Sequence, residues 1–348
     1  MNVSNTQIIS SYYGYYHNLV GLECIHHQTS NKTMTTSGLK NEWRLGSLIT
    51  ACFTMLNLTC PFIFIKYYFK CGSFDQLIGS VFQSSFEHRG KVRTLSRAYS
   101  LFSVTAWALA ACFFYVHWQP FFSVSWHYVV YAVTAFYTTG WWAAWLSIYG
   151  FVCHVHFLQG QIFVENMQER FQWSNRTVYE ERKRVGILLG AYNDFNRWIE
   201  RTQSEFGNVV SFAIVYHTIG IVVFSIAYLD KDFGNYYPLW QYIGAVAFDL
   251  CSIAIKLYPA AIVSTAIHRI TQRAGSECHT HYKNVDMPTQ RFQFYQHLAI
   301  REQDIGLRIL HVKISVKIAV GIFVTIVTAL ATFLRFVIVN MTSENSFL

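Results

Sequence analysis

Residues 98–164 read AYSLFSVTAWALAACFFYVHWQPFFSVSWHYVVYAVTAFYTTGWWAAWLSIYGFVCHVHFLQGQIFV, sixty-seven positions without one Asp, Glu, Lys or Arg. A helix crosses the hydrocarbon core of a bilayer with about 20 apolar residues, so this stretch is long enough for two crossings. Gln119 and Pro120 lie near its middle, flanked by Trp118 and Trp126, and supply a polar, helix-breaking turn. The stretch therefore predicts an integral membrane protein.

Composition supports the same class. Hydrophobic residues make up 53% of the 348 positions and charged residues 13%, about half the share usual in soluble domains. Other largely uncharged stretches span 45–65, 206–229, 233–267 and 318–339, the third interrupted by Asp249 and Lys256 and the last by Arg335. We therefore predict an all-α, polytopic membrane protein with six to seven transmembrane helices.

The net charge of +8 follows the membrane topology and does not indicate a nucleic-acid partner. The linkers 66–97, 165–205 and 265–317 hold six, seven and eight Lys or Arg residues, whereas 119–127 and 340–348 hold none. Cytoplasmic loops carry an excess of Lys and Arg, so the three basic linkers are expected in the cytosol and the C-terminus outside. The predicted organisation begins with an N-terminal segment (1–45), three spans (46–164) and a cytosolic helical linker (165–205). Two spans (206–264), a cytosolic anchor-helix region (265–317), a final span (318–340) and an external C-terminus (341–348) follow.

The long linkers carry helical patterns of their own. Apolar residues recur at helical spacing through 157–206, with a turn near Ser174 and Asn175, and a further amphipathic helix is expected over 292–310. These segments are expected to extend the spans into a packed intracellular helical layer. The alternative is that they lie on the membrane surface as amphipathic helices.

The last span has a polar stripe. Gly321, Thr325, Thr328, Thr332 and Arg335 recur at steps of three or four and share one face of a helix otherwise made of Ile, Val, Phe, Leu and Ala. A water-filled pore favours hydroxyl groups on such a face. The alternative is close helix packing, in which membrane Thr and Gly contact a neighbour and bond their own backbone. Four copies of Arg335 at an outer mouth would repel cations, unless the side chain extends outward to the headgroups.

Two ionisable residues share one face of the span 233–267. Asp249 and Lys256 lie seven positions apart, about 10 Å along a helix, which is too far for a direct pair. Charged residues inside a membrane are costly and indicate a functional role. Lys256 is expected to extend to the cytosolic headgroups, and Asp249 to bond a ligand, a partner helix or His217.

Aromatic residues gather on neighbouring spans and suit a pocket for a small, mostly apolar ligand. Packing between helices, or contact with lipid, is the alternative role for such stripes. The candidate ligand-binding residues are Tyr137, Trp141, Trp145, Tyr216, His217 and Asp249.

No cofactor and no resident metal are expected. Cys153, His154 and His156, and a similar run from Cys278 to His281, could pool ligands for zinc, but their spacing departs from structural zinc sites. There is no Gly-rich phosphate loop and no nucleophile elbow, so the sequence does not indicate an enzyme.

One stretch contains Tyr12, Tyr13, Tyr15 and Tyr16 and continues to Trp43 and Arg44. A second runs from Phe292 through Leu310 into a last span ending Thr332, Phe333 and Leu334. Both stretches resemble the corresponding segments of the insect gustatory receptors. Phe333 stands where the family signature has Tyr, and Val339 and Asn340 stand where it has Gln and Phe. The family has seven spans and a cytosolic N-terminus. Here residues 66–97 are too polar for the second span, so this chain lacks it, or is an incomplete gene product, or crosses with residues 8–26 instead.

The resemblance implies a chemosensory, ligand-gated cation channel in the plasma membrane of sensory neurons. It implies a homo- or hetero-tetramer joined through the cytosolic helical layer, with the last span of each subunit lining one pore and a small-molecule tastant as ligand. G-protein-coupled receptors and small-molecule transporters are the rival classes. No Asp-Arg-Tyr or Asn-Pro-x-x-Tyr motif supports the first, and no pair of broken spans supports the second.

Overall fold

The computed structural model describes residues 79, 89–118, 126–171, 178–229, 239–281 and 288–345. This part is almost entirely helical, which confirms the all-α prediction in its coarse form. The N-terminal segment, the predicted first span, the doubtful second span and the outer turns near 119–125 and 230–238 lie outside the described residues.

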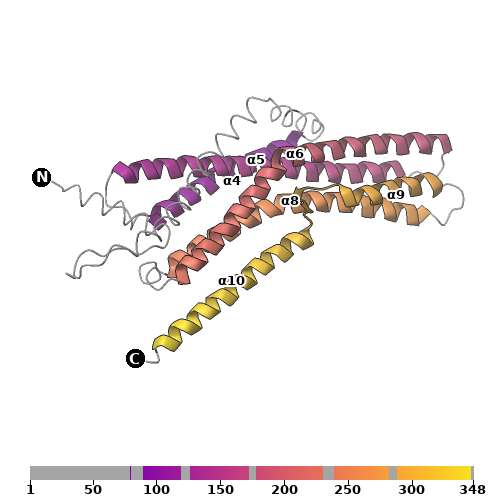
Figure 1. Cartoon of the computed structure of the whole chain (residues 1–348). Helices are drawn as coiled ribbons and strands as arrows, with labels where there is room; N and C mark the ends of the chain where they lie inside the picture. Colours follow the sequence, from indigo (N-terminus) through magenta and orange to yellow (C-terminus); the bar gives the residue numbers. More distant parts are fainter. Residues whose placement is uncertain are drawn as a thin grey trace, which may run out of the picture.

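Six helices and one short hairpin make up the described part (Figure 1). In chain order they are α4 (Arg89–Trp118), α5 (Trp126–Phe171), α6 (Val178–Leu229), α8 (Leu239–His281), α9 (Pro288–Asp304), β1 (Arg308–Ile309), β2 (Val312–Lys313) and α10 (Val316–Asn345).

Three helices are much longer than a bilayer is thick. The helices α5, α6 and α8 contain 46, 52 and 43 residues. At 1.5 Å per residue they measure about 69, 78 and 65 Å, whereas the hydrocarbon core is about 30 Å across. Roughly half of each helix therefore extends beyond a single crossing. The predicted helical extensions are confirmed as continuous parts of α5 and α6 over 157–171 and 178–206, and the turn predicted near Ser174 and Asn175 lies outside the described residues.

Three helices in the described part are long and apolar enough to cross a membrane. They cover Tyr179–Val222, Val246–Cys278 and Val316–Phe333. This supports a membrane protein. The count of six to seven spans and the sidedness of the linkers stay predictions.

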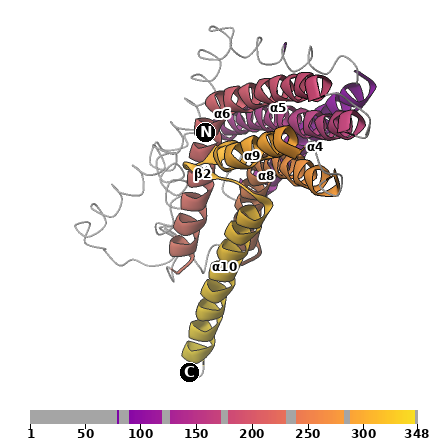
Figure 2. The same ribbon diagram turned by 90° about the vertical axis from the view of Figure 1, so that its right-hand side faces the viewer.

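The core is built where the long helices pack side by side (Figures 1 and 2). The helix α5 contacts α4 and α8, α6 contacts α8, and α9 packs on α8. Apolar residues from the extensions fill this core, among them Met167, Phe171, Tyr192, Phe195, Ile199, Ile267, Ile270 and Leu298. The amphipathic pattern of the linkers thus buries its apolar face inside the protein.

Figure 1 shows α8 changing direction along its length. Pro259 lies inside this helix. Proline has no backbone N–H and its ring clashes with the preceding turn, which kinks a helix. The kink lets the C-terminal part of α8 run beside α9 and its N-terminal part run toward α10.

The predicted amphipathic helix over 292–310 is wrong at its C-terminal end. The helix α9 ends at Asp304, and Gly306 follows with φ of 146°, which no helix accommodates. The chain then forms an antiparallel hairpin in which Arg308 pairs with Lys313 and Ile309 with Val312. Ile305, Leu307, Ile309 and Ile314 are buried, so the apolar residues after Asp304 pack a hairpin against the core and do not continue the helix.

Polar groups fix this hairpin to α6 and α8. The Gln203 side chain donates to the Arg308 carbonyl at 2.9 Å and accepts from the Arg308 N–H at 2.6 Å. Ser211 Oγ accepts from the Leu310 N–H at 3.0 Å, and Ser264 Oγ donates to the Ile314 carbonyl at 2.5 Å. The start of α10 is thereby held by two of the long helices.

The turn of the hairpin carries backbone strain that substitution should relieve. Leu310 and His311 have φ of 51° and 65°, the left-handed region that glycine and asparagine prefer. We expect His311→Gly to raise the free energy of unfolding by about 1 kcal/mol, because a side chain costs about 1–2 kcal/mol in this conformation. Denaturant titration of the detergent-solubilised protein measures the change. Val312→Gly, in the neighbouring strand, should instead lower stability.

Candidate functional site

The helix α10 has two distinct faces. Ala319, Ile322, Ile326, Leu330 and Phe333 are partly buried and pack against the core. The predicted pore residues Gly321, Thr325, Thr328, Thr332 and Arg335 are all exposed. At 100° per residue, the centres of these two stripes lie roughly 140° apart around the helix. The polar stripe therefore points away from the protein's own core.

Little of the apolar segment of α10 is covered by this chain. None of the 18 residues of its apolar segment Val316–Phe333 is buried, and its mean hydropathy is 2.2. Figures 1 and 2 show α10 projecting away from the bundle of α5, α8 and α9 toward the C-terminus. An exposed apolar helix of this length requires lipid or other subunits around it.

Two hydroxyl groups of the polar stripe bond their own helix. Thr325 donates to the Gly321 carbonyl at 2.8 Å and Thr332 to the Thr328 carbonyl at 2.9 Å. Both bonds satisfy the hydroxyl proton and leave the oxygen able to accept from water or from a neighbouring chain. The bonds are compatible with both roles foreseen for this stripe, a pore wall and a close helix contact.

The structure brings Asp249 and His217 together. His217 Nδ1 lies 2.7 Å from Asp249 Oδ1, and both side chains are largely buried between α6 and α8. Gly220 leaves room for the carboxylate, because a Cβ atom there would come within 3.0 Å of Asp249 Oδ2. Of the three partners foreseen for Asp249, the described structure contains the contact with His217.

Lys256 does not extend to the cytosolic headgroups, and that prediction is wrong. Its side chain is only 1% exposed, and its ammonium group donates to the Ser252 carbonyl at 3.0 Å. Helical side chains lean toward the N-terminus of their helix, which here points Lys256 back along α8 toward Asp249. A basic and an acidic residue thus lie inside the same helix pair.

Removal of the Asp249 carboxylate should weaken this helix pair. We expect Asp249→Leu to lower the free energy of unfolding by about 1–3 kcal/mol, because His217 is then buried without its partner. Asp249→Asn should lose about 1 kcal/mol or less, since the amide still hydrogen bonds the imidazole. Denaturant titration in detergent compares the two variants. Equal stability of Asp249→Leu and the wild type would contradict this role.

The aromatic candidates occupy different environments. Trp145 is buried and stacks on Tyr149 at 5.9 Å between ring centroids, and it also contacts Phe206. Tyr137, two turns earlier in α5, is exposed, and Trp141 is partly buried. Tyr216 lies next to the His217 ring. Trp145 thus packs in the core, while the ligand-binding role of the set stays a prediction.

The cysteine and histidine runs have separate partners. His154 Nδ1 lies 2.5 Å from the Tyr99 hydroxyl, and His156 contacts Thr202 and Gln159. Within the described residues, no three His, Cys, Asp or Glu side chains form a group that could hold a metal ion.

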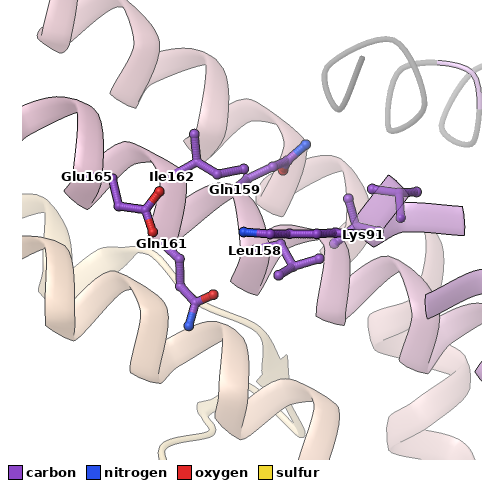
Figure 3. A pocket seen from close by; sticks show the side chains of 8 residues that line it. Lys91, Leu158, Gln159, Gln161, Ile162 and Glu165 are labelled. Carbon is purple, nitrogen blue, oxygen red and sulfur yellow. The ribbon is translucent and has the colours of Figure 1, made fainter. Parts of the chain in front are cut away.

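A groove lies between the start of α4 and the C-terminal half of α5 (Figure 3). Val92, Val155, Leu158 and Ile162 form its apolar part, and Lys91, Gln159, Gln161 and Glu165 its polar part. It lies on helices that carry none of the predicted pore residues.

Sequence reasoning missed an ion pair that joins three helices. Arg291 Nε in α9 donates to Glu181 Oε1 in α6, and the Arg291 guanidinium lies 4.6 Å from the centre of the Phe171 ring at the end of α5. Both charged side chains are buried. The two residues are 110 positions apart, so no local spacing could indicate the pair.

Comparison with known proteins gives no family. No protein-family model matches the chain, and no curated protein matches it. The resemblance to gustatory receptors stays a prediction from sequence.

Proposed function

We propose that this chain is a subunit of a chemosensory receptor of the gustatory type, a ligand-gated cation channel whose pore is lined by α10. The proposal rests on one observation, that α10 has two faces on roughly opposite sides of the helix. One face packs against the protein's own core, and the other presents Gly321, Thr325, Thr328 and Thr332.

In this proposal the polar side of α10 faces water. A water-filled pore solvates the threonine oxygens and the Arg335 guanidinium, whereas lipid tails do not. Several copies of the chain arranged about one axis would supply that pore and cover the exposed apolar residues that flank the stripe. A tetramer, homomeric or formed with other receptor subunits, satisfies both demands. The long extensions of α5, α6 and α8 give the subunits a large cytosolic layer through which to assemble.

Arg335 bears on ion selectivity. It is exposed and lies on the polar side of α10, one turn beyond Thr332. With its guanidinium among the headgroups, the pore conducts cations; with it directed into the pore, several positive charges at the mouth favour anions. Reversal potentials measured after replacement of sodium or of chloride distinguish these cases.

The ligand in this proposal is a small, mostly apolar tastant. Tyr137, Trp141, Tyr216, His217 and Asp249 supply aromatic surface with a few polar groups, which suits such molecules. Trp145 supports the pocket from the core side. Asp249 and His217 link α6 to α8, and both helices hold the hairpin that precedes α10. Ligand contact with this pair therefore has a short physical route to the pore helix.

The proposed location is the plasma membrane, with the basic linkers in the cytosol and the C-terminus outside. Expression in oocytes with a panel of tastants tests the function. We expect a rapid ligand-evoked current that persists when G-protein signalling is blocked. Current that requires a G protein would favour a coupled receptor, and saturable uptake without conductance would favour a transporter.

A further inference from the structure

The start of α4 carries exposed cations on one face. Arg93 and Arg97 lie four residues apart, are both exposed, and form no ion pair among the described residues. The opposite face packs on α5 through Val92, and the Tyr99 hydroxyl contacts His154 of α5. The two guanidinium groups therefore stand free of the helix pair.

The same face continues as an apolar surface. Leu101 is 69% exposed and Val104 is 59% exposed. At 100° per residue, positions 93, 97, 101, 104 and 108 fall within about 80° of one another. Two cations thus lead directly into an exposed apolar stripe along one continuous helix.

The change from the basic start of α4 to its uncharged remainder matches the surface of a bilayer. Residues 98–118 contain no Asp, Glu, Lys or Arg, and twenty-one residues of helix span about 32 Å, close to the thickness of the hydrocarbon core. Arg97 then lies at the headgroup level. The basic linker before it is predicted to be cytosolic, and the cytosolic leaflet carries the anionic lipids.

We propose that this face of α4 binds an anionic phospholipid of the cytosolic leaflet. The phosphate lies between Arg93 and Arg97, because guanidinium groups bind phosphate oxygens through paired N–H donors. The acyl chains lie along Leu101 and Val104. Lys91 is not part of this site, since it lines the groove of Figure 3 together with Glu165, on a different side of the helix. The site is independent of the proposed channel function.

Titration of the purified, detergent-solubilised chain with dioctanoyl phosphatidylserine tests the site. Lipid adducts are counted by native mass spectrometry, and the unfolding temperature is followed in parallel. We expect saturable binding of phosphatidylserine and none of dioctanoyl phosphatidylcholine. The double variant R93Q/R97Q should bind roughly thirtyfold more weakly, since each basic residue near an anionic membrane is worth about fivefold.

A matched control uses two other exposed cations. Arg182 and Lys183 lie at the start of α6, also in a basic segment, but no continuous exposed apolar stripe follows them directly. The variant R182Q/K183Q should bind phosphatidylserine as the wild type does, and both variants should unfold at the wild-type temperature without lipid. Equal weakening by both variants, unchanged binding by R93Q/R97Q, or an equal shift with inorganic phosphate alone would overturn the assignment.

Discussion

Arg291→Met is expected to lower the free energy of unfolding by about 3–5 kcal/mol. Arg291 bonds Glu181 and covers the Phe171 ring, and both charged side chains are buried. Removal of one partner leaves the other charge buried without compensation, which is among the most destabilising single changes in a protein. Denaturant titration in detergent, followed by tryptophan fluorescence, measures the loss.

Two controls separate this effect from simple loss of contact. The double variant Glu181→Leu with Arg291→Met should recover most of the stability, because no charge is then left unpaired. Arg197→Met breaks the exposed pair with Asp194 and should change stability by about 0.5 kcal/mol or less. A loss from Arg291→Met no larger than that from Arg197→Met would show that the buried pair does not hold α6, α9 and α5 together.

The helices were predictable because their signals are local. The uncharged run 98–164, the apolar spacing over 157–206 and the polar stripe of α10 each follow from neighbouring residues, and the described residues of these stretches are helical. His217 is one of the three partners predicted for Asp249. It was accessible to sequence reasoning because a buried carboxylate requires a partner and few polar residues are available within the spans.

Other features depend on contacts that no local pattern encodes. The hairpin after α9 forms because Gln203 and Ser211 of α6 and Ser264 of α8 satisfy its backbone, and these residues are 50 to 105 positions away. The first strand of the hairpin does have a local signal, because Ile305, Leu307 and Ile309 alternate with Gly306 and Arg308 at the spacing of two that indicates a strand. The position of Lys256 toward one end of its span favoured the headgroups, but its side chain leans toward the N-terminus of α8 and bonds the Ser252 carbonyl.

In the proposed channel, the threonine side of α10 faces water. Cysteine substitution at Thr325, Thr328 and Thr332 should allow a charged aqueous thiol reagent to modify the channel while ligand is present. Modification of a pore wall by a bulky charged group should abolish most of the current. The reaction requires water at the thiol, because a thiolate is the reactive form and does not persist in lipid.

Cysteines on the packed face supply the matched control. Ile322 and Ile326 lie on the same helix as the threonines and at a similar depth, but they contact the core of their own chain. We predict that I322C and I326C keep their current under the reagent, whereas T325C, T328C and T332C lose it, faster with ligand than without. Protection of all three threonine positions, or equal reaction on both faces, would contradict a pore lined by α10.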